Sequence, residues 1–315
     1  MSKKEILFLL SLLCFCNCSN PLSDEEEKVP ETFPVQFSIQ LNKEIIPYVN
    51  TRSFPNDSVP EPRSSEDPIS SPNSGDVQSL CSRINYVVYN TENPLVPVKH
   101  KRYKSEDATI DFGIVYDSLP MGNYEIRLLA HSSATNELTE NSLTFDEVTD
   151  AFYNQTSITI GSGEKISKDI NLQRIVGRIE FMATDTIHSN LKQFKIQLTG
   201  YPNKFNLLTG KGIPSVNEFT INHLFTPEET GKENNIHSLL SFIPEENKSM
   251  VVKLTATDTL DRYLWSYSIE SVIPQVNKIL RYSGKLYSPR SSNESVNLYL
   301  ENINWGETID IPLID

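Results

Sequence analysis

The chain has 315 residues, of which 41 are acidic and 28 are Lys or Arg, and its formal net charge is −13 at pH 7. This charge argues against nucleic acid as a partner, because phosphate binding requires clustered basic residues. Apolar side chains make up 38% of the residues, so a chain of this length can build two domains with hydrophobic cores of their own.

The N-terminus is typical of a targeting segment. Lys3 and Lys4 precede an apolar run that ends in Cys14, Cys16 and Cys18. This is the layout of a secretory signal peptide, and the apolar run is far too short to cross a bilayer as a helix. The cysteines lie on the hydrophobic segment itself and no second cluster follows in the sequence, so the spacing argues against a metal site.

Lipid attachment explains the cysteines best. In bacterial lipoproteins a peptidase cuts before a cysteine at the end of the apolar run, and that cysteine then carries acyl chains. We expect residues 1–17 to be removed and Cys18 to be acylated, because Asn17 is fairly small whereas Cys16 follows the bulky Phe15. Each buried methylene contributes about 0.8 kcal/mol, so several acyl chains give a stable membrane anchor where one would be marginal.

The segments that follow differ in composition. Residues 18–32 contain the acidic run 24–27 and predict a solvated tether. Residues 33–41 alternate apolar and polar side chains, which predicts a half-buried strand. Residues 50–79 are rich in Pro, Ser and acidic side chains. We expect an extended, mobile loop there, because the segment cannot bury enough apolar surface to offset its ordering entropy.

Short β runs separated by turn signals fill the rest of the chain. Strands are expected at residues 83–90, 108–116, 123–132, 157–160, 165–172, 174–184, 192–201, 249–258, 262–272, 278–288, 295–302 and 307–314. Residues 144–154 predict a short helix. Strands at such intervals are typical of β-sandwiches. We therefore expect an all-β protein with a domain boundary near residue 173.

Motifs that carry chemistry are missing from the sequence. It has no Gly-x-Ser-x-Gly elbow, no His-Glu-x-x-His helix and no phosphate-binding glycine loop. We therefore predict no catalytic, cofactor or metal residues and no enzymatic activity. His131 and Cys81 have no partners in the sequence, and we expect both to be structural. Trp265 and Trp305 are the candidates for a sugar-binding platform, although Trp265 alternates in phase with its neighbours as a core residue would.

Five segments occur in the order "LCSRINYVVYN", "LPMGNYEIRLLAHSS", "TDAFYNQTSITI", "LQRIVGRIEF" and "IPQVNKILRYSGKLY". In this order they resemble the fimbrial anchor family of the Bacteroidales, the FimB-type outer-membrane lipoproteins. The resemblance covers roughly residues 33–290 and includes the lipoprotein signal. Its most specific residues are Leu119, Pro120, Gly122, Tyr124, Ala130, His131, Pro274, Asn277, Gly284 and Leu286. Gly122 and Tyr124 also have a plain structural explanation, as a turn residue and the first core residue after it.

This resemblance implies two tandem transthyretin-like β-sandwich domains, residues 33–172 and 173–315, preceded by the lipoprotein signal peptide. It implies a surface-exposed protein of the outer membrane that holds the base of a fimbria and limits its length. The acidic run 24–27 is similar to the export tag of such lipoproteins. Pilin subunits would be the protein partners, and no cofactor is implied.

Pilins of this kind join by strand addition, in which an extended segment of one subunit completes a sheet of the next. Ile309, Ile311 and Leu313 would share one face of a C-terminal strand. That strand is either donated to a pilin or is an ordinary edge strand of the second domain. Cleavage after Arg52 or Arg63 would instead indicate a stalk or tip pilin. A further alternative is a surface glycan-binding lipoprotein.

Overall fold

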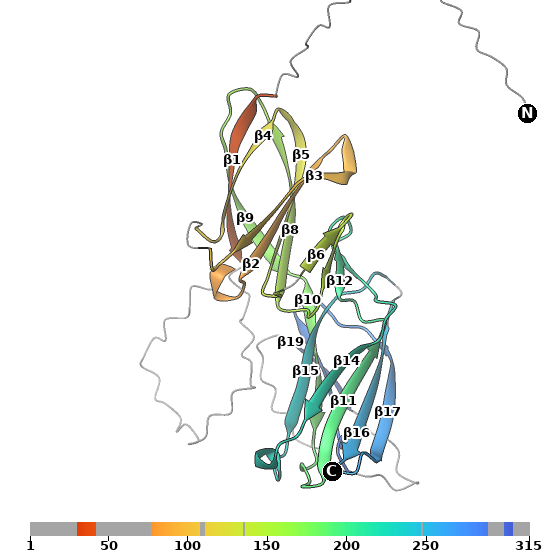
Figure 1. Ribbon diagram of the computed structural model, residues 1–315. Coiled ribbons are helices and arrows are strands. Elements are labelled where there is room, and N and C mark those ends of the chain that lie inside the picture. The colour runs from red at the N-terminus through yellow and green to blue at the C-terminus, as the bar shows by residue number, and fades with distance from the viewer. Residues whose placement is uncertain are drawn as a thin grey trace, which may run out of the picture. The chain divides into compact units, whose positions relative to one another are not determined.

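The computed structural model describes residues 30–41, 77–107, 111–134, 136–246, 248–288 and 299–304 (Figure 1). Over these residues the regular elements are strands, apart from two 3-10 turns, η1 (Val77–Ser79) and η2 (Pro227–Glu229). The all-β prediction is therefore confirmed. The predicted signal peptide, Arg52, Arg63, Trp305 and the strand at 307–314 lie outside the described residues. Of the loop predicted at 50–79, residues 50–76 also lie outside the described residues, and its last three residues form η1.

The first half of the chain forms a seven-stranded sheet that folds around one core (Figure 1). In order across the sheet, the strands are β3 (Asn93–Lys104), β2 (Arg83–Asn90), β5 (Gly122–His131), β8 (Ala151–Ile160), β9 (Ile166–Arg174), β1 (Thr32–Leu41) and β4 (Ile114–Pro120). β8 and β9 pair only around Phe152 and Tyr153. The sheet can bend there, and its two arms enclose apolar side chains from β1, β4 and β9 on one side and β2, β5 and β8 on the other.

Three four-stranded sheets make up the rest of the described chain. The small sheet consists of β6 (Asn136–Thr139), β7 (Ser142–Phe145), β12 (Lys204–Asn206) and β13 (Lys211–Ile213). A second sheet consists of β15 (Asn235–Phe242), β10 (Val176–Ala183), β18 (Lys278–Gly284) and β19 (Tyr299–Asn304). A third consists of β14 (Phe219–Leu224), β11 (Leu191–Thr199), β16 (Met250–Asp258) and β17 (Tyr263–Val272).

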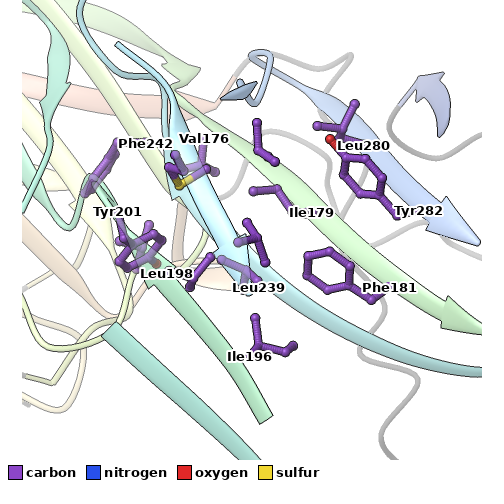
Figure 2. Close-up of a cluster of buried hydrophobic side chains, with 14 of the residues drawn as sticks. Val176, Ile179, Phe181, Ile196, Leu198, Tyr201, Leu239, Phe242, Leu280 and Tyr282 are labelled. Carbon is purple, nitrogen blue, oxygen red and sulfur yellow. The ribbon is translucent and has the colours of Figure 1, made fainter. Parts of the chain in front are cut away.

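A second core fills the space between the sheet that contains β10 and the sheet that contains β11, and it continues into the small sheet. Figure 2 shows part of it, where Phe181 of β10 stacks on Tyr282 of β18 with ring centroids 5.7 Å apart. Phe242 of β15 contacts both Phe145 of β7 and Phe205 of β12, at centroid distances of 5.2 and 5.1 Å. Strand β7 therefore joins the two halves of the chain, since it precedes residue 173 in sequence but packs in the second core.

Two sequence-based expectations are wrong. Residues 144–154 form no helix, because Thr144 pairs with Lys204 in the small sheet and β8 starts at Ala151. In the described part of the strand expected at 108–116, residues 112–113 form a turn in which Gly113 has a φ of 101°, and β4 begins at Ile114. Several short strands of the second half, β12 to β15, were not expected from the sequence.

Candidate strand-exchange site

The residues predicted to carry the function are not among those that the structure describes. Cys18, the acylation site, and Ile309, Ile311 and Leu313, the candidate donor strand, all lie outside the described ranges. The feature of the described chain that bears on strand addition is β1, together with the two strands that flank it.

β1 is a buried central strand although it is the first of the described strands. It pairs antiparallel with β4 and parallel with β9, so both of its edges are occupied (Figure 1). Phe33, Val35, Phe37, Ile39 and Leu41 are buried in the first core, whereas the alternate residues are half-buried or exposed. Period-2 alternation of this kind is what places one face of a strand in a core.

The aromatic ring of Phe37 lies 5.9 Å from that of Tyr86 on the opposite arm of the sheet, measured between centroids. Backbone ladders on both sides and alternate side-chain pockets are the two features by which a donor strand binds in strand addition. β1 is thus held in its groove by the same contacts that an added strand would make.

The neighbouring strand β4 carries an inward-pointing acid. Asp117 is in phase with Val115 and Leu119, which are both in the core, and its side chain is 2% exposed. Its carboxylate accepts hydrogen bonds from Lys99 Nζ at 2.9 Å and Lys101 Nζ at 2.6 Å. Burial acts to raise the pKa of Asp117, but the hydrogen bonds from the two lysines outweigh it and lower the pKa below its ordinary value.

Side chains of β3 also reach the backbone of β4. The carbonyl of Tyr116 accepts from Lys101 Nζ at 3.3 Å and from the Tyr103 hydroxyl at 3.2 Å. The carbonyl of Ser118 accepts from Lys99 Nζ at 3.0 Å. We call Lys99, Lys101, Tyr103 and Asp117 the lysine clasp. It joins the two edge strands of the seven-stranded sheet through side chains.

His131 is structural, as its isolation in the sequence predicts. It is fully buried, its Nδ1 accepts from the Ser133 N–H at 3.1 Å, and its Nε2 lies 2.9 Å from the Asn85 side-chain amide. The other end of that amide lies 3.0 Å from His100 Nε2. Burial, reinforced by the charge of Arg102, lowers the pKa of His131 to about 3, so the ring is neutral at physiological pH.

Arg174 connects the two halves of the chain. Its guanidinium donates to both carboxylate oxygens of Asp150 and, through Nη1, to Asn277 Oδ1 at 2.7 Å. Asn277 adopts a left-handed backbone with a φ of 56°. Beside it, Gly177 packs so closely that an added Cβ would lie 2.4 Å from the Gln275 carbonyl oxygen. These contacts explain why an Asn and a Gly suit these positions.

Two further residues singled out in the sequence are buried. Trp265 is 6% exposed, and its indole N–H donates to the carbonyl of Leu286. It is therefore a core residue and not a sugar platform. Cys81 is a buried free thiol whose pKa is raised by burial, with a contribution from Asp150. An unreactive thiol is the expected result.

Other kinds of site are not found in the described part of the chain. There, no group of three or more His, Cys, Asp or Glu side chains is placed to hold a metal ion. No helix within those residues is long and apolar enough to cross a membrane.

The lysine clasp was not predicted from the sequence. Two signals for it are visible afterwards. Lys99, Lys101 and Tyr103 recur with period 2, and Asp117 takes a core position between Val115 and Leu119. An acid in phase with core residues needs a charged partner, but the sequence does not show which strand supplies it.

Comparison with known proteins gives one family and several solved structures. A family of unknown function (DUF6562) matches residues 129–280. No curated protein matches the chain. The chain is similar to candidate polysaccharide-binding proteins (DUF1812) of Bacteroides thetaiotaomicron, with a TM-score of 0.49 and 8% identity over 80% of this chain and 92% of that one.

Two other solved structures are similar to a comparable extent. One is a candidate adhesin of Bacteroides ovatus, with a TM-score of 0.48 and 10% identity over 82% of this chain and 88% of that one. The other is the fimbrial anchor protein Mfa2 of Porphyromonas gingivalis, with a TM-score of 0.43 and 8% identity over 80% of this chain and 90% of that one.

Proposed function

We propose that this protein is a fimbrial anchor or assembly subunit. Acyl chains on Cys18 hold it in the outer membrane with its folded part exposed at the cell surface. Strand-addition contacts with pilin subunits then fix the base of a fimbria and limit its length. In this proposal the chain divides near residues 172 and 173 into two tandem transthyretin-like sandwiches, and it performs no catalysis.

The observation that carries the proposal is β1. An anchor must keep its first strand, because a filled groove accepts no strand from another subunit and so ends the polymer. β1 fills its groove completely, with two backbone ladders and five buried apolar side chains. The sequence resemblance and the predicted acylation site support the same interpretation.

Mass spectrometry of protein taken from the cell surface tests the proposal. An anchor should begin at an acylated Cys18 and retain β1. The C18A variant should lose the acyl chains, and the matched C16A variant should keep them. A mature chain that starts at residue 53 or 64 would contradict the proposal, because cleavage after Arg52 or Arg63 would make the protein a stalk or tip pilin.

The C-terminal segment is the proposed donor strand. Replacement of Ile309, Ile311 and Leu313 by Asp should detach fimbriae from the cells or change their length, because a donor strand binds through alternate apolar side chains. Replacement of the intervening Thr308 and Asp310 by Asn is the matched control. Fimbriae that remain attached and of normal length after deletion of residues 307–315 would exclude donation.

The glycan-binding alternative has lost one of its two aromatic candidates, since Trp265 is buried and hydrogen-bonded. Trp305 lies outside the described residues. A glycan array separates the two functions, because an anchor that binds only pilins should retain no sugar.

A further inference from the structure

Strands β3 and β4 approach each other at the two ends of the seven-stranded sheet, and the side chains of the lysine clasp bridge them. We call this line of contact the seam. Both strands are edges of the seven-stranded sheet, and among the described residues each has a backbone ladder on one side only. Unpaired strand edges are templates for addition of another strand, and proteins protect them with lysines and inward-pointing charges. The lysine clasp supplies both devices at this seam.

The backbone of β4 has acceptors and donors that face the seam. The carbonyls of Tyr116 and Ser118 accept from β3 side chains, so they point away from β1. Ser118 also stands opposite Pro34 of β1, which has no N–H to donate. Because the N–H and C=O of one strand residue point to the same side, the N–H groups of Tyr116 and Ser118 face the seam as well.

The seam is basic within an acidic protein. Residues 99–104 read KHKRYK, whereas the whole chain has a net charge of −13. The side chains of Lys99 and Lys101 are 34% and 40% exposed, so they can move out into water without unfolding the sheet. Leu95 and Val98 on β3 and Tyr116 on β4 add exposed apolar surface to the same two strands.

We propose that the seam-facing edge of β4 is a strand-acceptor site for an extended acidic segment of a partner subunit. The N–H groups of the incoming strand replace the lysines at the carbonyls of Tyr116 and Ser118. Its carboxylates then pair with the amines of Lys99 and Lys101. The inference rests on the proposed function for the kind of partner, a neighbouring fimbrial subunit, but it places the contact on an edge other than the β1 groove.

Charge decides which strands the site accepts. Lys99 and Lys101 both donate to Asp117 Oδ1, and each also donates to one carbonyl of β4. Both lysines lose that carbonyl when a strand is added, so each needs a new acceptor. A carboxylate on the incoming strand provides that acceptor, whereas a basic segment would place like charges side by side in the seam. The lysine clasp therefore excludes strands without acidic residues and is displaced by strands that carry them.

Binding of synthetic peptides to the mature full-length protein tests the inference. A nine-residue peptide of alternating Glu and Val should bind saturably, and the matched Lys and Val peptide should bind at least about tenfold more weakly. Hydrogen exchange followed by mass spectrometry should show slower exchange at residues 114–118 with the acidic peptide. Equal binding of both peptides, no binding, or protection of a different edge strand would overturn the inference.

Variants locate the effect. The K99M/K101M/D117N protein removes the charged groups together, so no buried carboxylate is left without a partner. It should bind the acidic peptide about tenfold more weakly than the wild type and lose the preference over the basic peptide. The K253M variant changes an exposed lysine of β16 and should bind as the wild type does. A triple variant that keeps the preference contradicts the proposed site, and its melting temperature shows whether it is folded.

The outcome is separable from that of the proposed function. If the acidic peptide binds at β4 but the protein from the cell surface carries no acyl chains, the strand-acceptor site is supported and the anchor function is contradicted. If the chain begins at an acylated Cys18 but binds no peptide, the anchor function is supported and the strand-acceptor site is contradicted.

Discussion

Arg174 donates two hydrogen bonds to the carboxylate of Asp150, from Nε to Oδ1 at 2.8 Å and from Nη2 to Oδ2 at 2.7 Å. The guanidinium side chain is 1% exposed. A buried bidentate pair of this kind has a fixed geometry, and the third donor of Arg174 reaches Asn277 from the second half of the chain. The pair therefore positions the last residue of β9 against the loop that precedes β18.

Removal of one member of this pair should be costly. R174M leaves the Asp150 carboxylate buried without its partner, and we expect the free energy of unfolding to fall by about 3–5 kcal/mol. The R174M/D150N double variant removes both charges and should recover part of that loss. Urea unfolding followed by circular dichroism measures both. A double variant that is as unstable as the sum of its two single variants would show that the residues do not act as a pair.

The close packing at Gly177 predicts a second effect. In G177A, the added methyl group would lie 2.4 Å from the Gln275 carbonyl oxygen, so the backbone must shift. We expect a loss of about 1–3 kcal/mol in the free energy of unfolding. G161A is the matched control, because its methyl group would meet only the flexible side chain of Glu164. Equal stability of the two variants would contradict the packing argument.

Acid should destabilise the protein through His131. Its pKa is about 3 in the folded chain, against an ordinary value of 6.5. The unfolded chain therefore binds a proton that the folded chain does not as the pH falls from 6.5 towards 3. The contribution of His131 to stability is complete above pH 6.5 and is lost below it, with a slope of up to about 1.4 kcal/mol per pH unit.

Urea unfolding at several pH values between 7 and 4 measures this slope. The H131Q variant has no ring to protonate, so its stability should depend less steeply on pH than that of the wild type. The overall stability of the variant is not the readout, because any change in this buried network also alters packing. Identical slopes would show that His131 does not cause the acid sensitivity.

The anchoring of β1 can be tested at Phe37, which is fully buried. Loss of a buried Phe ring costs about 3–5 kcal/mol, so F37A should unfold at lower urea concentration. Hydrogen exchange should become faster along β1 in this variant. Q40A changes an exposed residue of the same strand and should exchange as the wild type does. If F37A accelerates exchange equally in all strands, β1 is not a separately removable element.

Period-2 alternation was sufficient to predict the strand at 33–41, because it places one face of that strand in a core. It failed for β3, in which Pro94 and Pro97 and a run of basic residues hide the pattern. Prolines are tolerated there because β3 is an edge strand, which depends on the tertiary fold. The clasp was missed for the same reason, since Asp117 and its two lysines are brought together only by the approach of two sheet edges.

The helix expected at 144–154 shows a different limit. Phe145, Val148 and Phe152 have the spacing of a helical apolar face, and all three are buried. Phe145 lies on β7 and packs against Phe242, Phe152 lies on β8 in the first core, and Val148 lies between the two strands. Local spacing cannot distinguish one helix from two strands whose apolar residues enter different cores.

The pairing of β7 with β12 also has a mechanical consequence. In sequence, the two halves of the chain meet at Ile175, between β9 and β10. The β7–β12 ladder links the same halves at a second place, and the bond from Arg174 to Asn277 adds a link next to the covalent crossing. Tension applied along the chain is therefore distributed over several bonds at the junction. The junction should resist stretching and twisting better than a single connecting strand would.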